Sequence, residues 1–539
     1  MTAPAAARVS ARTGPFASTR LLTRLDLRRE RIIVPVTVLV LVVTSAAALS
    51  SVNQLYGTDA ERAALAASAQ NAAFELLLGP LEHLRPQAAI ACWRVSLFMI
   101  TATAVCAVLL VTRLTRKEED LGRVELVRAA HTGRFAPLAA ALTVAAGFSV
   151  IVGAAMTGLA TTAGASAGQA ALDGTRYTAV ALAATGLAAM TAQIASTARA
   201  ANLLAVSLVI GGYVLRGTGD AAGIGWLRWT NPVGWAEQTD PYGARHWWPI
   251  VACVAVFAVG AALAAWVSTR RDLGSGLLPP RPGPASSPVA GIGGLMARLD
   301  RGGFIGWLLG LAVFAVLLGA LAQTAASLTS DNPAMLDYLR RVGGTGALID
   351  VFLATEAVYL GFAVATWAVT TVTRMRADEE AGRTEALLAT PASRSRYLID
   401  RAALIVAGSV VLLLVSGLLV GGAAAASTGD ASLVGGAVAA AAVQVPAALV
   451  IGLGALAIYA VAPRFTVGGG WAMAVLAFLL GPLGELFGLS HLVRDISPFT
   501  HVPQVPSGPM QWAPIVVLVA VDVALAAVAR WRFGRRDIS

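Results

Sequence analysis

Residues 32–52 read IIVPVTVLVLVVTSAAALSSV, a run without a single charged residue. A helix of about 20 apolar residues is long enough to cross the ~30 Å hydrocarbon core of a bilayer. Because backbone groups in lipid must bond within their own segment, such a run predicts a helix and not a strand of an open sheet. The whole chain has the same character, with 57% hydrophobic residues and a mean hydropathy of +0.71.

Eleven further apolar runs follow along the 539 residues. They lie near 88–112, 137–162, 176–195, 201–216, 248–268, 304–326, 350–373, 398–425, 432–460, 467–489 and 512–530. The first run is too long for the apolar core of a signal peptide, so we expect it to be a span. The sequence therefore predicts an all-α polytopic membrane protein with twelve transmembrane helices.

The formal net charge of +10 is distributed unevenly along the chain. With a cytoplasmic N-terminus, thirty of the 40 Lys and Arg residues fall on the inner side of the predicted spans and nine on the outer side. This is the positive-inside pattern, and it explains the basic pI without a nucleic-acid partner. We expect a multi-pass protein of the cytoplasmic (inner) membrane with both termini in the cytoplasm. Arg94 falls within a span and is expected to extend toward the membrane surface.

An internal duplication is visible as ordered matches at offsets of 260–265 residues. Gly122-Arg123-x-Glu125 corresponds to Gly382-Arg383-x-Glu385, and Arg271-Asp272-Leu273 corresponds to Arg536-Asp537-Ile538. Six spans in each half is an even number, so both halves would have the same orientation in the membrane. The sequence thus predicts two parallel six-helix repeats.

We divide the chain into four predicted parts: a cytoplasmic N-terminus (1–31), a first half (32–272), a linker rich in Gly and Pro (273–297) and a second half (298–539). The N-terminus carries apolar residues on one helical side and arginines on another, which predicts an amphipathic helix at the inner membrane surface. Ordinary flanking charge is the alternative. The two sets are Leu21, Leu25 and Ile32, and Arg20, Arg24, Arg28 and Arg31.

Two charged loops follow the second span of each half. We expect one short helix in each loop, with acidic residues and a glycine on one side and an i,i+4 ion pair on another. The predicted sides are Glu118, Gly122 and Glu125 in the first loop and Asp378, Gly382 and Glu385 in the second; the predicted pairs are Glu119–Arg123 and Glu379–Arg383. A solvated connector is the alternative, but the same pattern in both halves favours a symmetric docking partner.

The second loop, EEAGRTEALLATPASR (379–394), resembles the first cytoplasmic loop of ABC-2-type exporter permeases. ISPFTHVPQVP (496–506) and, more loosely, NPVGW (231–235) are similar to outer segments of the fused twelve-span actinobacterial exporters of polyketide antibiotics, the tetronasin-transport type. The resemblance extends from about Arg20 to Ser539. The first loop departs from the pattern, because VRAAH (127–131) stands where the second loop has LLATP.

The resemblance implies that each loop is a coupling helix for one of two copies of a separately encoded ATP-binding subunit. ATP and Mg²⁺ would bind that partner, because this chain has no G-x-x-x-x-G-K-[ST] phosphate-binding motif. The chain itself would be a transport subunit and not an enzyme. It would extrude hydrophobic or amphipathic small molecules such as antibiotics or other drugs, and its other surroundings would be the lipid bilayer.

By the same resemblance, the second and fifth spans of each half would line the substrate cavity. The side chains we select there are Phe98, Met99, Tyr213, Phe352, Glu356 and Tyr359, for which simple packing is the alternative. The proline-containing outer segments would form short broken helices that act as an outer gate. The gate candidates are Pro232, Trp235, Pro498, Phe499 and Pro503.

Two other classes of protein remain as alternatives. A proton-driven secondary transporter can also have two parallel halves, and it would need buried carboxylates, for which Glu356, Asp350 and Asp522 are candidates. A membrane-embedded enzyme is disfavoured, because no nucleophile and base are paired and no histidine has a metal-ligand partner at helical spacing. The three cysteines lie in apolar runs and predict neither a disulfide framework nor a metal site.

Overall fold

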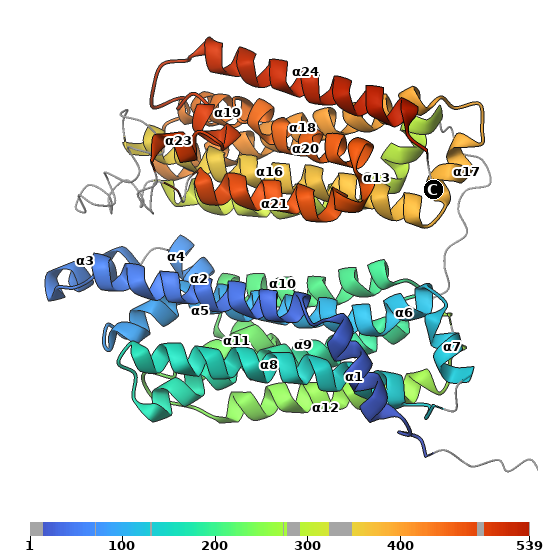
Figure 1. Ribbon diagram of the computed structural model, residues 1–539. Helices are drawn as coiled ribbons and strands as arrows, with labels where there is room; N and C mark the ends of the chain where they lie inside the picture. Colours follow the sequence, from blue (N-terminus) through green and yellow to red (C-terminus); the bar gives the residue numbers. More distant parts are fainter. Residues whose placement is uncertain are drawn as a thin grey trace, which may run out of the picture. The chain divides into compact units, whose positions relative to one another are not determined.

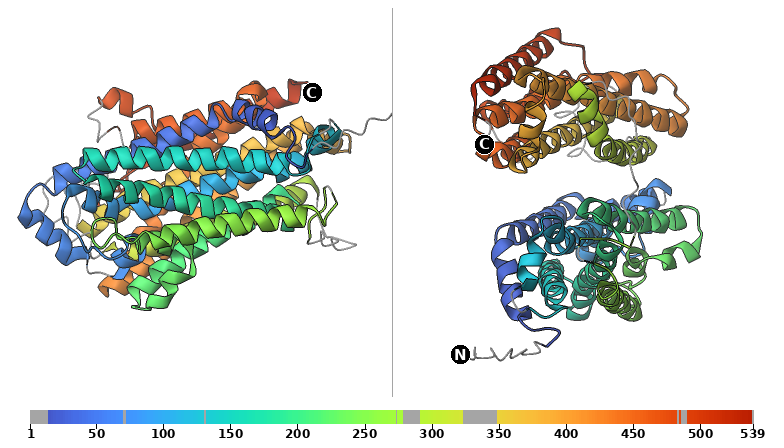
Figure 2. Two further views of the ribbon diagram at one scale, coloured as in Figure 1. Left: turned by 90° about the horizontal axis from the view of Figure 1, so that it is seen from below. Right: turned by 90° about the vertical axis from the view of Figure 1, so that its right-hand side faces the viewer.

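The computed structural model describes residues 14–69, 72–129, 132–272, 274–277, 291–322, 348–481, 484 and 490–537. These residues form two compact units, Met1–Gly283 and Pro284–Ser539, which we describe one at a time. Twelve helices are long and apolar enough to cross a membrane, which confirms the predicted all-α polytopic class. Figures 1 and 2 show long helices running side by side within each unit.

The first unit contains six of the candidate spans and several short helices at their ends. Its elements are α1 (Thr19–Arg29), α2 (Ile33–Leu55), α3 (Asp59–Ala69), α4 (Ala72–Leu78), α5 (Gln87–Leu114), α6 (Arg116–Asp120), α7 (Arg123–Ala129), α8 (Ala136–Thr162), α9 (Ala167–Ile194), α10 (Ala198–Ala221), the 3₁₀ helix η1 (Gly225–Thr230), α11 (Pro232–Glu237) and α12 (Trp248–Ser268). In Figure 1, α1, α6 and α7 lie at one end of this unit, and α3 and α4 lie at the other.

The second unit contains the other six candidate spans. Its elements are α13 (Gly291–Ala320), α16 (Leu348–Glu380), α17 (Arg383–Leu388), α18 (Arg394–Thr428), α19 (Leu433–Ala442), α20 (Val445–Val461), η2 (Pro463–Phe465), α21 (Thr466–Leu480), α23 (His491–Arg494), η3 (Pro498–His501) and α24 (Trp512–Arg535). Here α17 and the C-terminal end of α24 lie at one end, and α23 lies at the other.

Close backbone contact holds the centre of the first unit together. Helix α9 packs against α5, α8 and α12. At its crossing with α12, a Cβ on Gly186 would lie 2.7 Å from the Cα of Phe257, and a Cβ on Gly260 would meet the backbone of Gly186. Small residues allow membrane helices to approach in this way, so these two glycines set the α9–α12 distance.

Two predicted boundaries are wrong for physical reasons. The fourth span begins at Ala167 and not near 176, because Asp173 and Arg176 neutralise each other within the helix through a buried ion pair of 2.6 Å. The predicted linker reaches 297, but α13 begins at Gly291. There Met296 is buried, and Gly293 lies so close to α18 that a Cβ would be 3.0 Å from a carboxylate oxygen of Asp400. Linker residues 278–290 lie outside the described part.

The predicted amphipathic helix is present as α1, which packs against α8. Its apolar residues Leu21 and Leu25 are exposed, as a face directed toward lipid requires, and Asp26 lies on the buried side. Its position at a membrane surface stays a prediction. Arg94 is half-buried, with its guanidinium carbon 5.6 Å from the ring centroid of Tyr56.

Candidate functional site

Both charged loops have the same backbone course. A glycine with positive φ follows the helix that ends the second span, and a short helix begins directly after it. The φ angle is 68° at Gly122, before α7, and 70° at Gly382, before α17. Each glycine N–H donates to the carbonyl of the residue three positions earlier, Glu119 or Glu379, at 2.9 Å in both loops. The two halves therefore retain the same turn.

This turn contradicts the predicted single helix with one acidic side. A left-handed residue ends an α-helix, so residues before and after the glycine do not share a helical face. The predicted Glu119–Arg123 and Glu379–Arg383 pairs are also wrong. Arg123 instead pairs with Glu118 at 3.1 Å, and Arg383 pairs with Asp378 at 2.6 Å, each across the glycine turn.

The acid before each turn is bound by an arginine from the end of the sixth span. In the first unit, Glu119 accepts from Arg271 at 2.5 Å and from Arg116 at 2.9 Å. Arg116 is fully buried and also donates to the carbonyls of Ser196 and Gly274. These contacts join the loop to the α9–α10 connection and to the segment after α12.

The second unit repeats this arrangement with its own residues. Glu379 accepts from Arg536 at 2.6 Å and from Arg376 at 3.4 Å, and its side chain is only 2% exposed. Arg536 also donates to the carbonyl of Tyr459 at 3.0 Å and lies over the ring of Phe533. In both units, therefore, the loop is fixed to the second and sixth spans by one carboxylate, of the half-buried Glu119 or the buried Glu379, and we call this arrangement the loop clamp.

The N-terminal segment of each half is tied to the same region. In the first unit, Arg29 pairs with Glu118 at 2.8 Å, and Glu30 pairs with Arg113 at 3.2 Å. In the second unit, Asp300 pairs with Arg374 at 3.5 Å and also contacts Arg401. In each half, therefore, an arginine near the end of the second span pairs with an acid from the N-terminal segment of that half.

Six of the ten predicted coupling residues are exposed, namely Gly122, Arg123, Glu125, Gly382, Arg383 and Glu385. Glu125 on α7 and Glu385 on α17 are exposed, whereas Glu119 and Glu379 belong to the loop clamps. Leu387 and Leu388 on α17 pack against the core of their own unit. The prominent apolar side chain is Leu126 on α7, which is 74% exposed.

The candidates for the substrate cavity fall into two groups. Tyr213 and Phe352 are buried within their own units, and the Tyr213 hydroxyl donates to the carbonyl of Leu77, so packing explains them. The others are at least partly open: Phe98 is exposed, its ring 5.7 Å from that of Tyr213, and Met99 is half-buried beside it on α5. Glu356 and Tyr359 lie one turn apart on α16 and are also half-buried.

Four of the five gate candidates lie in short helices, and Pro503 lies two residues beyond the end of η3. Pro232 opens α11, where the Asn231 side chain caps the helix by accepting from the Gly234 N–H at 2.9 Å. Trp235 donates from its indole to the carbonyl of Trp229 at 2.6 Å. In the second unit Pro498, Phe499 and Pro503 are buried. The ring of Phe499 stacks on that of Phe362 of α16, with 3.8 Å between the ring centroids. A gating role stays a prediction.

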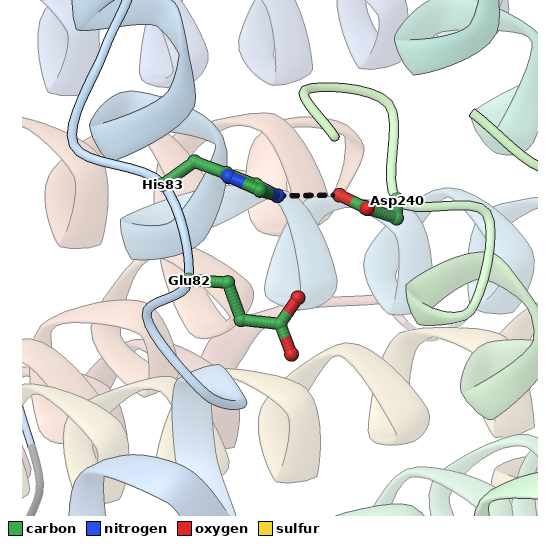
Figure 3. A group of neighbouring side chains, drawn as sticks. All are labelled: Glu82, His83 and Asp240. Carbon is green, nitrogen blue, oxygen red and sulfur yellow. Dashed lines mark hydrogen bonds and ion pairs between the residues drawn. The ribbon is translucent and has the colours of Figure 1, made fainter. Parts of the chain in front are cut away.

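Sequence spacing did not reveal a polar cavity of about 250 Å³ at the α3 end of the first unit. Glu82, His83 and Asp240 lie along its wall, and Figure 3 shows them converging from two segments that are distant in sequence. The His83 Nε2 and the Asp240 Oδ1 are 2.8 Å apart. The expectation from sequence concerned only metal-ligand partners at helical spacing, whereas 157 residues separate His83 from Asp240.

A buried charge network lies next to this cavity. Arg216 pairs with Asp220 at 2.9 Å, and Arg228 pairs with the same carboxylate at 2.5 Å. Glu237 is 3.8 Å from Arg216, and burial raises the pKa of its carboxyl to about 8, although Arg216 acts in the opposite direction. Asp522 on α24 is a further buried carboxyl, and its Oδ1 has no hydrogen-bond partner among the described residues.

Twelve candidate spans with charged loops clamped at one end define a polytopic α-helical membrane protein. Residues 289–534 match the family described as the C-terminal domain of the multidrug efflux system permease Rv1217c. Across 549 aligned residues, the chain is 36% identical to the multidrug efflux system permease protein Rv1217c of Mycobacterium tuberculosis, covering 99% of this chain and 98% of that protein. The chain belongs to this family of multidrug efflux system permeases.

Proposed function

We propose that this chain is the membrane subunit of an ATP-driven exporter of the ABC-2 type, with two copies of a separate ATP-binding subunit as its partners. The observation that carries the proposal is the loop clamp, which has the same geometry in both units. A short exposed helix, α7 or α17, follows a clamped turn in each case. Mg²⁺ and ATP would bind the partner.

The clamp provides a path for force. A partner that pushes on the exposed side of α17 acts on a helix whose turn is joined through Glu379 to Arg536 at the end of α24. Because this ion pair joins the buried Glu379 to Arg536, whose side chain is only 10% exposed, movement of the loop should also move the ends of α16 and α24. The same reasoning applies to α7, Glu119 and Arg271.

The exported compounds are proposed to be hydrophobic or amphipathic drugs, including antibiotics. The relative of the same family is named a multidrug efflux permease. In this chain, Phe98 and Met99 on α5 and Glu356 and Tyr359 on α16 offer partly open, mainly apolar surfaces, which suit such compounds.

Reconstitution tests the energy source. The purified chain is expected to hydrolyse no ATP in proteoliposomes, and drug efflux is expected only after an ATP-binding partner is added, with vanadate inhibiting it. Two partner copies per chain are expected from mass measurement of the complex. Efflux that proceeds without the partner and is abolished by a protonophore would instead establish the secondary transporter, for which the buried Asp522 is the supporting observation.

Orientation is tested by cysteine labelling. We propose that the loop-clamp ends and both termini face the cytoplasm of the cell across its cytoplasmic (inner) membrane. After replacement of Cys92, Cys106 and Cys253, an exposed cysteine at Thr58 or Ser490 should react with an impermeant maleimide on intact cells. A cysteine at the exposed Ser393 should react only after lysis. The reverse labelling pattern would overturn the orientation.

A further inference from the structure

We propose that the first unit binds a divalent transition-metal ion through Glu82, His83 and Asp240. The three side chains come from the segment between α4 and α5 and from the loop that follows α11. Figure 3 shows His83 and Asp240 directed at each other, with the Glu82 carboxylate extending into the same space. The proposal is separate from export and holds whatever the chain transports.

The distances between these side chains fit one bound ion. One ligand atom from each residue can be chosen so that all three lie within 4.8 Å of one another. Two ligands on a tetrahedral zinc ion, with bonds of about 2.0–2.2 Å, are roughly 3.4 Å apart. The 2.8 Å contact between His83 Nε2 and Asp240 Oδ1 would therefore lengthen by about 0.6 Å when an ion replaces the shared proton.

The loop after α11 is built to present the Asp240 carboxylate. Its Oδ2 accepts from the Ala244 N–H at 2.6 Å, which leaves Oδ1 directed at His83. Gly243 makes this approach possible, because a Cβ there would lie 2.1 Å from the Asp240 Oδ2 and 2.5 Å from the His83 Nε2. Outer hydrogen bonds of this kind orient metal ligands in known sites.

The cavity that these three residues line offers room for a cation and its water ligands. It holds about 250 Å³, enough for an ion together with water ligands. The two arginines in its wall pair with acids, Arg176 with Asp173 and Arg228 with Asp220, which also binds Arg216. Glu237 in the same wall lies 3.8 Å from Arg216. The carboxylates left for an ion in the cavity are therefore those of Glu82 and Asp240.

The ligand types indicate which ions fit. One imidazole nitrogen and two carboxylate oxygens suit Zn²⁺ or Mn²⁺ better than a soft ion that requires thiolates. Cys92 lines the same cavity, but its sulfur lies 2.8 Å from a guanidinium nitrogen of Arg176. We therefore assign the site to a borderline or hard divalent ion, with water from the cavity completing its coordination.

Calorimetry on the full-length protein in detergent or nanodiscs tests this site, after treatment with a chelator and its removal. Titration with ZnCl₂, and separately with MnCl₂, should show one saturable site for at least one ion and a higher Tm at saturation. His83→Ala and Asp240→Asn should each weaken binding at least tenfold. His246→Ala is the matched control, because His246 lines the same cavity outside the cluster.

Glu82→Gln keeps the test decisive if the other variants fold poorly, because Glu82 is exposed and its replacement leaves the His83–Asp240 contact in place. This variant should also weaken binding while its Tm without metal stays at the wild-type value. Absence of saturable binding of either ion would overturn the proposal. Equal affinity in the wild-type, Glu82→Gln and His246→Ala proteins would also overturn it, since the ion would then bind elsewhere.

Discussion

Ion pairs between largely buried side chains join the helices within each unit. The Glu379–Arg536 ion pair is the clearest case, since both side chains are at most 10% exposed. Removing one partner of such a pair leaves an uncompensated charge in an apolar surrounding, which typically costs about 3–5 kcal/mol. We therefore expect Arg536→Ala to lower the Tm of the purified protein strongly, as measured by fluorescence-detected thermal unfolding.

The neighbouring residue provides the control for this experiment. Arg535 is exposed and lies over the ring of Trp531 on its own helix, so Arg535→Ala should leave the Tm nearly unchanged. Combining Arg536→Ala with Glu379→Gln should recover part of the loss, because the unpaired charge is removed as well. A double variant no more stable than Arg536→Ala would show that the lost Tyr459 and Phe533 contacts, and not the charge, account for the effect.

Asp26 on α1 gives a pH-dependent prediction. Burial raises the pKa of this carboxyl from 3.8 to about 6, with Arg29 opposing and Glu118 and Glu30 adding to the shift. The folded state thus holds the proton more tightly than the unfolded chain, and the stabilising effect of protonation is lost as pH rises from about 4 through 6. Asp26→Asn should match the wild type in Tm near pH 4 and exceed it above pH 7.

The size of that gain is limited because Arg29 already offsets part of the effect of burial. We expect no more than about 1 kcal/mol, or roughly 1–2 °C in Tm for a chain of this size. Asp59→Asn is the control: this exposed carboxyl pairs with Arg85, which lowers its pKa, so its replacement should give no gain at high pH. A Tm difference between Asp26→Asn and the wild type that is the same at pH 4 and pH 8 would contradict the assignment.

Single residues also show where sequence reasoning reached its limit. The sequence showed the match between Arg271 and Arg536 at an offset of 265 residues, but it did not show which acid each arginine binds. Each arginine pairs with an acid more than 150 positions away, at Glu119 or Glu379, and helical periodicity reports only on neighbours three or four apart. The predicted i,i+4 pairs were wrong because they assumed a continuous helix, whereas a glycine turn lies between the two residues of each pair.

Among the elements, the turn before α17 depends on one backbone conformation. Gly382 has φ 70°, and no atom lies within 4 Å of where its Cβ would be, so conformation alone penalises a side chain there. A residue with a Cβ in the left-handed region costs about 1–2 kcal/mol. We expect Gly382→Ala to reduce drug efflux with the partner subunit bound, because relief of this strain would displace α17 from its contacts.

Two variants separate conformation from the mere loss of a glycine. Gly382→Asn should be milder than Gly382→Ala, since asparagine tolerates the left-handed region better. Gly435→Ala lies within helix α19, also without a nearby atom, and should be neutral or slightly stabilising. Efflux that is equally reduced by Gly382→Ala and Gly435→Ala would show that the turn has no special role.

The number of spans was predictable, and their ends were less so. Hydropathy detects a run of apolar residues long enough for a bilayer, and all twelve runs correspond to candidate spans. It fails where charges neutralise one another, as Asp173 and Arg176 do near the start of α9. It also fails where glycine packs closely inside a helix, as Gly293 does at the start of α13.

In the molecule as a whole, duplication left the loop clamp intact while the two halves diverged elsewhere. The cavity beside Glu82, His83 and Asp240 is formed by residues of the first unit. Its residues come from two segments brought together by folding, so no sequence pattern could have indicated it. The cluster could therefore be identified from the folded structure but not from the internal duplication of the sequence.

The two loops are anchored unequally, which leads to a prediction about coupling. On α17, Thr384 is fully buried and Leu387 and Leu388 pack on the core, whereas α7 has no buried residue. Movement of α17 by a docked partner should therefore displace the spans more than the same movement of α7. Among the exposed acids, we expect Glu385→Ala to reduce partner-stimulated ATPase activity and efflux more than Glu125→Ala.

Contacts of a charged group at an interface are worth about 1.5–3 kcal/mol, so the loss at Glu385 should be roughly 10- to 150-fold in coupling. Glu385→Arg should be worse than alanine, because it reverses the charge that a complementary partner surface would meet. Membrane insertion and Tm should stay unchanged in all three variants, since both glutamates are exposed. Equal losses at Glu125 and Glu385 would mean that anchoring does not set the strength of coupling. Full activity in every variant would mean that the loops are solvated connectors, and the proposed docking of ATP-binding subunits on α7 and α17 would be wrong.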